Sequence, residues 1–261
     1  QAGDHRSGAG RAERGAMIAL DLNADLGEGM GNDEALLEIV TSASIACGGH
    51  AGNQATMRAA LVATRTNGVR AGAHPGFDDP EHFGRRRLSL PPEAIAAETV
   101  RQIDALSAKA AQEHVPLAYF KLHGALANMT AEDDALAETV FAAISASHPH
   151  LAALVLENSA QHRAAQRLGL ETIPEAYADR AYTPDGLLAS RALDGAVIHD
   201  DEKVVARCLR LAERGEIVAL DGTVLESSAT SICLHGDTPG AVSLARRIRS
   251  ALSAIGALAG R

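Results

Sequence analysis

The sequence predicts an α/β fold, a seven-stranded (β/α) barrel, with a doubly wound open sheet as the alternative. About seven short apolar runs alternate along the chain with longer segments of helical periodicity. This alternation is typical of parallel strands joined by helices. Polar side chains, including four histidines, directly follow several of the apolar runs. Because such folds carry their sites at the carboxyl ends of the strands, these side chains are expected to share one face.

The first two predicted strands lead into polar, glycine-rich segments. Residues 17–20 are apolar and precede Asp-Leu-Asn-Ala-Asp-Leu-Gly-Glu-Gly at 21–29, which we expect to be a loop at the mouth of the barrel. A helix is predicted over 33–41, because aspartate is a good N-cap. The second strand, 44–47, leads to His50, which is flanked by glycine and alanine.

A helix and a third strand follow. Asn53 suits an N-cap and Gly68 a helix C-terminus, with apolar residues at helical spacing between them. Strand 69–72 then leads to His74. The long loop over 78–90 is expected to be functional or disordered, as loops of this length usually are.

The middle of the chain repeats this pattern. A helix is predicted over 91–114, since proline is tolerated in the first turn. Strand 117–122 ends at His123. A helix over 130–147 is predicted from a threonine and an aspartate at the spacing of a capping box.

The last third of the chain predicts three more strands, three helices and a hairpin. The strands are 151–156, 170–174 and 231–234, the helices are 159–169, 200–214 and 238–255, and the hairpin is 217–225. The hairpin is expected to turn on two residues, Asp221-Gly222. His235 directly follows the last strand.

The composition is that of a chain able to form one large domain. With 261 residues, 46% of them hydrophobic and 22% charged, it can bury about 70–75% of its unfolded surface. We assign 17–261 to one barrel domain and interpret 1–16 as a disordered extension, a cloning remnant or a misassigned start. The net charge of −9 disfavours binding to nucleic acid or to an anionic membrane. Three widely spaced cysteines, and no apolar run long enough to span a bilayer, favour a cytoplasmic location.

Seven side chains are expected to share one pocket at the ends of the strands. They are Asn23, Asp25, Glu28, His50, His74, His123 and His235. Imidazoles and a carboxylate can hold a divalent metal, for which Asp25, His50 and His74 are the candidates, or can act without metal as general acid and base. The spacing leaves both possibilities open, and no His-Glu-x-x-His helix is present.

Cationic side chains could hold an acidic substrate in this pocket. Lys121 and His123 lie two apart on a predicted strand and face the same side, so Lys121 could neutralise a carboxylate or a developing oxyanion. Arg180 and Arg191, in a second polar loop, could bind a carboxylate through the guanidinium fork. The phosphate-binding sequence G-x-x-x-x-G-K-[ST] does not occur.

Six groups of motifs together resemble the LamB/YcsF family, and they follow in order from Met17 to the C-terminus. They are 21–29, 46–52, 72–75 with 83–86, 121–126, Asp179-Arg180 with Asp185-Gly186 and Arg191, and 233–237. The sequence departs from the usual family pattern at Asn53-Gln54, Leu122 and Ala127. We therefore expect the shape of the pocket to differ near the last two positions.

The resemblance implies a barrel similar to those of glycoside hydrolases and polysaccharide deacetylases. It also implies the reaction of an ATP-dependent 5-oxoprolinase, in which 5-oxo-L-proline, ATP and water give L-glutamate, ADP and phosphate with partner subunits B and C. Since this chain has no nucleotide loop, we hypothesise that the partners activate the lactam with ATP and that this subunit hydrolyses the activated ring.

On that hypothesis the candidate residues take separate roles. Asp25, His50 and His74 position or deprotonate water, and His123 with Lys121 stabilises the oxyanion or protonates the leaving nitrogen. His235 with Asp237 closes the site. The residues expected to bind substrate are Asn23, Glu28, Lys121, Arg180, Arg191, His235 and Asp237.

Two other classes of function remain open. A stand-alone metal-dependent deacetylase or amidohydrolase, acting on a small or carbohydrate substrate, predicts bound metal and activity that a chelator abolishes. A non-catalytic binding subunit predicts turnover that does not depend on Asp25 or the histidines. The clustering of titratable groups argues against the second class.

Overall fold

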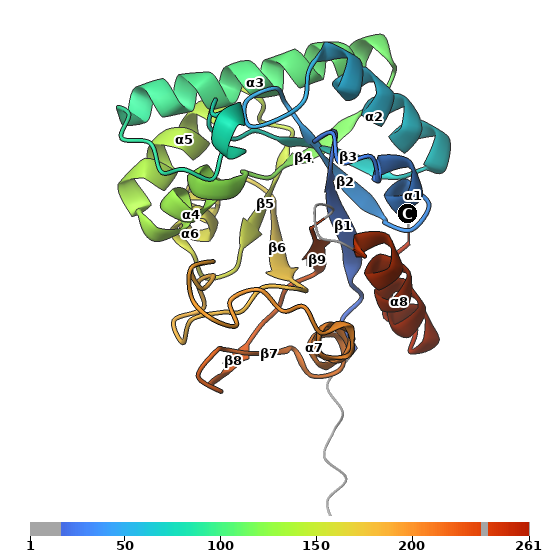
Figure 1. Cartoon of the computed structure of the whole chain (residues 1–261). Coiled ribbons are helices and arrows are strands. Elements are labelled where there is room, and N and C mark those ends of the chain that lie inside the picture. Colours follow the sequence, from blue (N-terminus) through green and yellow to red (C-terminus); the bar gives the residue numbers. More distant parts are fainter. Residues whose placement is uncertain (1–16, 236–239, 261) are drawn as a thin grey trace, which may run out of the picture.

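The chain forms a closed barrel of seven parallel strands with helices around it, in a computed structural model that describes residues 17–235 and 240–260. The strands follow one another around the barrel in the order β1-β2-β3-β4-β5-β6-β9, and the helices lie on the outside (Figure 1). The predicted seven-stranded barrel is confirmed, and the alternative of an open sheet is wrong. The predictions for residues 1–16, Asp237 and the first residues of the last helix lie outside the described residues.

The elements have the following bounds. The barrel strands are β1 (Asp21–Leu26), β2 (Ser42–Ala46), β3 (Arg70–His74), β4 (Leu117–Phe120), β5 (Ala152–Leu156), β6 (Thr172–Tyr177) and β9 (Ser231–Leu234). The helices are α1 (Asp33–Leu37), α2 (Gln54–Asn67), η1 (Pro80–His82), α3 (Pro92–Gln112), α4 (Gly124–Glu132), α5 (Asp134–Ser147), α6 (Ala160–Arg167), α7 (Asp201–Arg214) and α8 (Ala241–Ala254). A separate antiparallel pair is β7 (Glu216–Val218) with β8 (Val224–Glu226).

β1 lies later in the sequence than predicted, and this changes where its polar side chains lie. Residues 17–20, predicted as the strand, precede it, and the polar segment predicted as a loop is largely the strand itself. Asp21, Asn23 and Asp25 alternate along β1 and point into the barrel, whereas Leu22 and Ala24 between them pack in the outer apolar cluster. The prediction was wrong because a strand with one polar face contains no continuous apolar run.

Hydrogen-bonded polar side chains fill the middle of the barrel. Asn23 donates to Glu175 Oε1 at 3.0 Å and to Ser231 Oγ at 2.8 Å. Ser231 and Ser42 donate in turn to Asp21 Oδ2, at 2.6 and 2.7 Å. Buried polar groups are tolerated when they are partnered in this way.

The apolar core lies between the barrel and its helices. One cluster joins β2 to β5 with α2, α3 and α5, and another joins β1 and β9 with α1, α7 and α8. Alanine is frequent in both clusters and lets the helices approach the strands closely. None of the helices in the described ranges combines the length and hydrophobicity that crossing a membrane requires.

Several predicted element ends can be compared with the structure. Asn53 caps α2 by accepting from two backbone N–H groups, and Gly68 ends it with φ of 64°, as predicted. The helix predicted over 130–147 is confirmed at its end, Ser147, but its predicted start is wrong, because Thr130 belongs to α4 and Asp133 is the N-cap of α5. The hairpin connects β7 and β8 through residues 219–223, a longer link than the predicted two-residue turn.

Gly72 in β3 leaves room for the Tyr119 ring inside the barrel. A Cβ atom at position 72 would lie 2.3 Å from Cε2 of Tyr119, which is fully buried. Gly72→Ala is therefore expected to lower the free energy of unfolding in urea by about 1–3 kcal/mol through overpacking. Gly260→Ala is the control, since a Cβ there meets nothing within 4 Å. Equal stability of the two variants would contradict this role of Gly72.

Candidate active site

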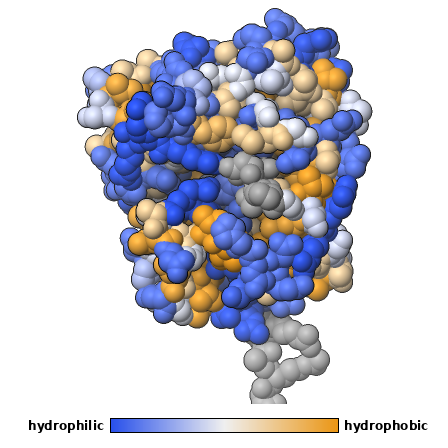
Figure 2. Space-filling model, viewed as in Figure 1, coloured by the Kyte–Doolittle hydropathy of each residue, from blue (hydrophilic) through white to orange (hydrophobic). Residues whose placement is uncertain are grey.

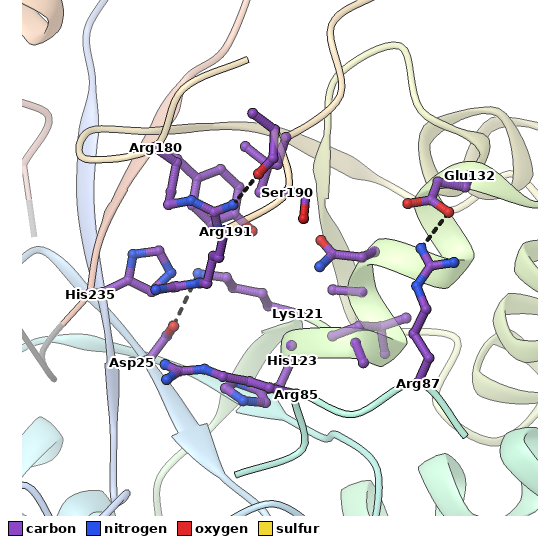
Figure 3. A pocket seen from close by; sticks show the side chains of 18 of the residues that line it. Asp25, Arg85, Arg87, Lys121, His123, Glu132, Arg180, Ser190, Arg191 and His235 are labelled. Atoms are coloured by element: carbon purple, nitrogen blue, oxygen red, sulfur yellow. Dashed lines mark hydrogen bonds and ion pairs between the residues drawn. The ribbon is translucent and has the colours of Figure 1, made fainter. Parts of the chain in front are cut away.

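A cavity of ≈ 360 Å³ lies at the carboxyl ends of the barrel strands. Charged and polar groups from β1, β3, β4, β6 and β9 or the segments after them converge on it (Figure 3). They are Asp25, His74, Lys121, His123, Tyr177 and His235. The face of the molecule in Figure 2 is mixed, with hydrophilic residues interspersed with hydrophobic patches.

Lys121 lies at the centre of this group and is enclosed by acceptors. Its Nζ is 3.0 Å from Asp25 Oδ1 and 3.0 Å from Glu175 Oε1. It also donates to Asn23 Oδ1 at 3.3 Å and to Cys233 Sγ at 2.9 Å. Burial alone would lower the pKa of this ammonium, but Asp25 and the other neighbours hold the pKa well above its usual value. Lys121 is thus a permanent cation that protein carboxylates already balance.

Asp25 is held ionised between Lys121 and His74. Its Oδ2 lies 3.5 Å from His74 Nε2. Burial raises the pKa of the carboxyl, but the charges of His74 and Lys121 outweigh it and keep the pKa well below its usual range. Asp25 can accordingly accept a hydrogen bond from water, and it is not a proton donor at neutral pH.

Three histidines and a glutamate form a compact cluster beside the cavity. His50 Nε2 is 3.0 Å from Glu28 Oε1, and His123 Nδ1 is 3.0 Å from His74 Nε2. The rings of His50 and His123 stack with their centroids 3.6 Å apart. One potential ligand atom from each of the four residues lies within 4.8 Å of all the others, so the cluster could hold a metal ion.

Two of the imidazoles in this cluster, those of His50 and His123, are kept neutral by their surroundings. Burial lowers the pKa of His50 to about 2, with a further contribution from His74. Burial also lowers the pKa of His123 well below its usual value, assisted by the neighbouring His50 and His74. Neutral imidazole is the form that binds metal ions.

A second group with possible ligand atoms consists of Asp25, Cys233 and His235. Burial raises the pKa of the Cys233 thiol well above its usual value, despite the opposing effect of Lys121. The Lys121 ammonium already contacts both Asp25 and Cys233. A metal ion there would have to displace one cation and deprotonate a thiol, so this group is the poorer metal site.

His235 forms a pair with Asp179 at the edge of the cavity. Its Nδ1 lies 2.9 Å from Asp179 Oδ1, so Nδ1 carries the proton and Nε2 is left to react. Burial raises the pKa of Asp179, but His235 outweighs this and the pKa is lowered. The ring also stacks against Tyr177. An imidazole oriented by a carboxylate in this way can accept and deliver protons.

The two arginines predicted to bind substrate have different environments. Arg180 donates to the backbone carbonyls of Ala189 and Ala196, at 2.6 and 3.3 Å, and so holds the loop between them. Arg191 extends from the same loop into the cavity, and Figure 3 shows it beside His235 and Lys121. Arg191 is thus the better placed of the two to bind an anionic substrate.

The predicted site residues that the structure describes come together, with two differences of position. Asn23 lies inside the barrel, bonded to Glu175, and does not stand at its mouth. Asp25, a predicted metal ligand, contacts Lys121, whereas Glu28 and His123 lie with His50 and His74. Glu175, Tyr177 and Asp179 were missed, although their alternation along β6 and beyond repeats the polar pattern of β1.

Comparison with known proteins gives matches along nearly the whole chain. A profile of the LamB/YcsF family matches residues 20–259. The A subunit of 5-oxoprolinase from Mycolicibacterium gilvum is 44% identical over 245 residues, which cover 92% of this chain and 97% of that protein. The protein of the same name from Neisseria meningitidis serogroup A is 44% identical over 240 residues, with 92% and 98% covered. The crystal structure of the lactam utilization protein from Thermus thermophilus superimposes with a TM-score of 0.86 at 37% identity, covering 93% and 99%.

Proposed function

The chain belongs to the LamB/YcsF family, and on that basis we propose that it is the ring-opening subunit of an ATP-dependent 5-oxoprolinase. Its relatives are named as the A subunit of 5-oxoprolinase and as a lactam utilization protein. The observation that carries the proposal is the single cavity in which Asp25, His235 and Arg191 converge. Its volume of ≈ 360 Å³ is near the lower end for ligand pockets, which suits a substrate as small as 5-oxo-L-proline.

The chemistry of the substrate explains why ATP and partner subunits are needed. A five-membered lactam is unstrained and stabilised by resonance, so its hydrolysis requires a source of free energy. The chain contains no G-x-x-x-x-G-K-[ST] sequence, so we assign the ATP-dependent activation of the lactam to subunits B and C. The three buried free cysteines suit a reducing cytoplasm, where ATP is available, and we propose that location.

Ring opening then takes place in the cavity of this chain. Water adds to the carbonyl carbon of the activated ring and gives up a proton, the bond from that carbon to nitrogen breaks, and the nitrogen gains a proton to become the amine of glutamate. A second water then releases the activating phosphate from the new carboxyl group. Asp25 orients the attacking water, and Lys121 acts on Asp25 by keeping it ionised. His235, oriented by Asp179, takes the proton that the attacking water loses onto Nε2 and delivers it to the nitrogen. His235→Gln should slow glutamate formation in the reconstituted complex; an unchanged rate would rule out this role.

Arg191 is assigned to the carboxylate of 5-oxo-L-proline, because its guanidinium lies in the cavity beside His235 (Figure 3). Arg191→Gln is expected to lower kcat/KM about 10- to 100-fold, mainly through KM, since a charge-assisted hydrogen bond to substrate is lost. Steady-state kinetics on the complex would measure this effect. Arg163→Gln, which removes an exposed partner of Asp134 on the outer surface, is the control and should leave both constants unchanged. An unaltered KM in Arg191→Gln would contradict the assignment.

The proposed function is tested by glutamate release from 5-oxo-L-proline. The purified chain is assayed alone and with subunits B and C, each with and without ATP. We expect glutamate only when all three subunits and ATP are present. Glutamate formed by this chain alone without ATP, or no glutamate in the complete mixture, would overturn the proposal. In the latter case a screen of acylated substrates would test for an amidohydrolase.

A further inference from the structure

We propose that Glu28, His50, His74 and His123 bind one divalent transition-metal ion, of which zinc fits the four side chains best. The proposal that the ion is bound stands on the geometry of the cluster alone. Only the inference that it serves ring opening rests on the proposed function.

The barrel brings these four residues together from neighbouring strands. Glu28 follows β1, His50 follows β2, His74 is the last residue of β3, and His123 follows β4. These strands are consecutive around the barrel. Since the strands are parallel, their carboxyl ends deliver all four side chains to one point, where each is nearly or fully buried.

Backbone carbonyl groups determine which nitrogens of two of the rings can bind a metal. His74 Nδ1 lies 2.9 Å from the carbonyl oxygen of Lys121, and His123 Nε2 lies 2.9 Å from that of Phe83. A carbonyl oxygen only accepts, so these two nitrogens carry the protons. When these rings bind a metal they are neutral, and the nitrogens left to bind it are His74 Nε2 and His123 Nδ1. Metal-binding histidines are commonly oriented by such a bond from the other ring nitrogen.

Potential ligand atoms of the four side chains face one another at short distances. His74 Nε2 and His123 Nδ1 face each other at 3.0 Å, although each is an acceptor in these tautomers. His50 Nε2 lies 3.0 Å from a carboxylate oxygen of Glu28, so a nitrogen and an oxygen that could bind one ion are side by side. A metal ion accepting the lone pairs of the three rings and the carboxylate accounts for the convergence.

Four of the six separations between the ligand atoms lie near those around a tetrahedral ion. With bonds of about 2.0–2.1 Å, the ligand atoms of tetrahedral zinc are about 3.3–3.4 Å apart. The corresponding separations here are 3.0 Å for His50 to Glu28, 3.0 Å for His74 to His123, 3.6 Å for His123 to Glu28 and 3.9 Å for His74 to Glu28. Small shifts of the side chains would complete the geometry.

The types of ligand atom also indicate which class of metal would bind. Imidazole nitrogen suits zinc, copper, iron and nickel, whereas magnesium and calcium prefer oxygen ligands. Asp25 is not one of the four ligands, since one of its oxygens is bound to Lys121. A bound ion of this class would act as a Lewis acid at the edge of the cavity that His74 and His123 line.

The test is metal binding by the purified full chain, measured without any assay of activity. The protein is stripped with a chelator, Zn²⁺ is added back and followed by calorimetry, and Co²⁺ is used as a spectroscopic probe of four-coordinate binding. We expect one ion per chain. His50→Gln and His123→Gln should each weaken binding at least about 10-fold. His235→Gln, which alters the second group of possible ligands, should leave the affinity unchanged.

Thermal unfolding with and without Zn²⁺ distinguishes a variant that has lost its metal site from one that does not fold. Zn²⁺ should raise the Tm of the wild-type chain, because an ion that binds the folded state stabilises it, and should not raise the Tm of His50→Gln. The proposal would be overturned by a folded wild-type chain that binds no Zn²⁺ or Co²⁺, or by binding that survives both ligand variants and is lost in His235→Gln. If the chain binds metal but the complete complex forms no glutamate, the proposed function is refuted and the metal site is not. Glutamate formation by a chain that binds no metal would refute the metal site alone.

Discussion

Asp25→Asn is expected to lower glutamate formation by the assembled complex about 10²- to 10⁴-fold, the range that a positioned acid–base or electrostatic group supplies. The substitution keeps the shape of the side chain and removes the negative charge that Lys121 and His74 stabilise. An amide presents only one acceptor oxygen, so it cannot both pair with Lys121 and orient water as the carboxylate does. The rate is measured with saturating ATP and 5-oxo-L-proline.

The control for this variant is Asp134→Asn. Asp134 is exposed on α5, pairs with Arg163 and does not line the cavity, so its removal should leave the rate of glutamate formation unchanged. Asp25→Asn protein must also assemble with the partners, which size-exclusion chromatography can show. An assembled Asp25→Asn complex that forms glutamate at the wild-type rate would contradict the assigned role.

Lys121→Met is expected to destabilise the fold by about 3–5 kcal/mol, the usual effect of removing one partner from a buried ion pair. The side chain is only 3% exposed and contacts the carboxylates of both Asp25 and Glu175. Without the ammonium these two buried negative charges face each other uncompensated. For a chain of this size we expect the Tm to fall by roughly 10 °C, measured by circular dichroism.

Two further variants identify the cause of this loss. Lys203→Met removes an ammonium that is 74% exposed and 3.9 Å from Asp200, so it should leave the Tm almost unchanged. Combining Lys121→Met with Asp25→Asn and Glu175→Gln should recover much of the lost stability, because no unpaired buried charge then remains. No recovery in the triple variant would show that packing, and not charge balance, explains the effect of Lys121.

The barrel could be predicted from the sequence because the outward faces of its strands are apolar and glycine or capping residues mark many of the helix ends. The inward faces of the strands were harder to predict, because some of them carry polar residues. In β1 the alternation of Asp21, Asn23 and Asp25 with apolar residues was interpreted as a loop, so the strand was placed too early. The same alternation in β6 concealed Glu175 and Tyr177. A search for continuous apolar runs therefore misses strands whose inward face is polar. A search for polar residues at every second position would find these strands.

The convergence of the histidines could be predicted, but their pairings could not. Parallel strands bring their carboxyl ends together, which is why His50, His74 and His123 were expected to share a site. The long loop over 78–90 decides how the rings are oriented, since Phe83 supplies the carbonyl that fixes the His123 tautomer. Gly84 in that loop packs against His50 so closely that a Cβ would lie 2.6 Å from the His50 Cβ. Such contacts depend on how the loop packs against the ends of the strands, and no local sequence pattern predicts this packing.

On the proposed function, the partner subunits use ATP to activate the lactam, and the ring is then opened in the cavity around Asp25. The most direct test is a rapid-quench measurement of ADP and glutamate from the same sample of the Asp25→Asn complex, mixed with ATP and 5-oxo-L-proline. We expect ADP to form at close to the wild-type rate in the first turnover while glutamate does not form. Loss of ADP and glutamate together, or formation of both at the wild-type rate, would contradict this expectation.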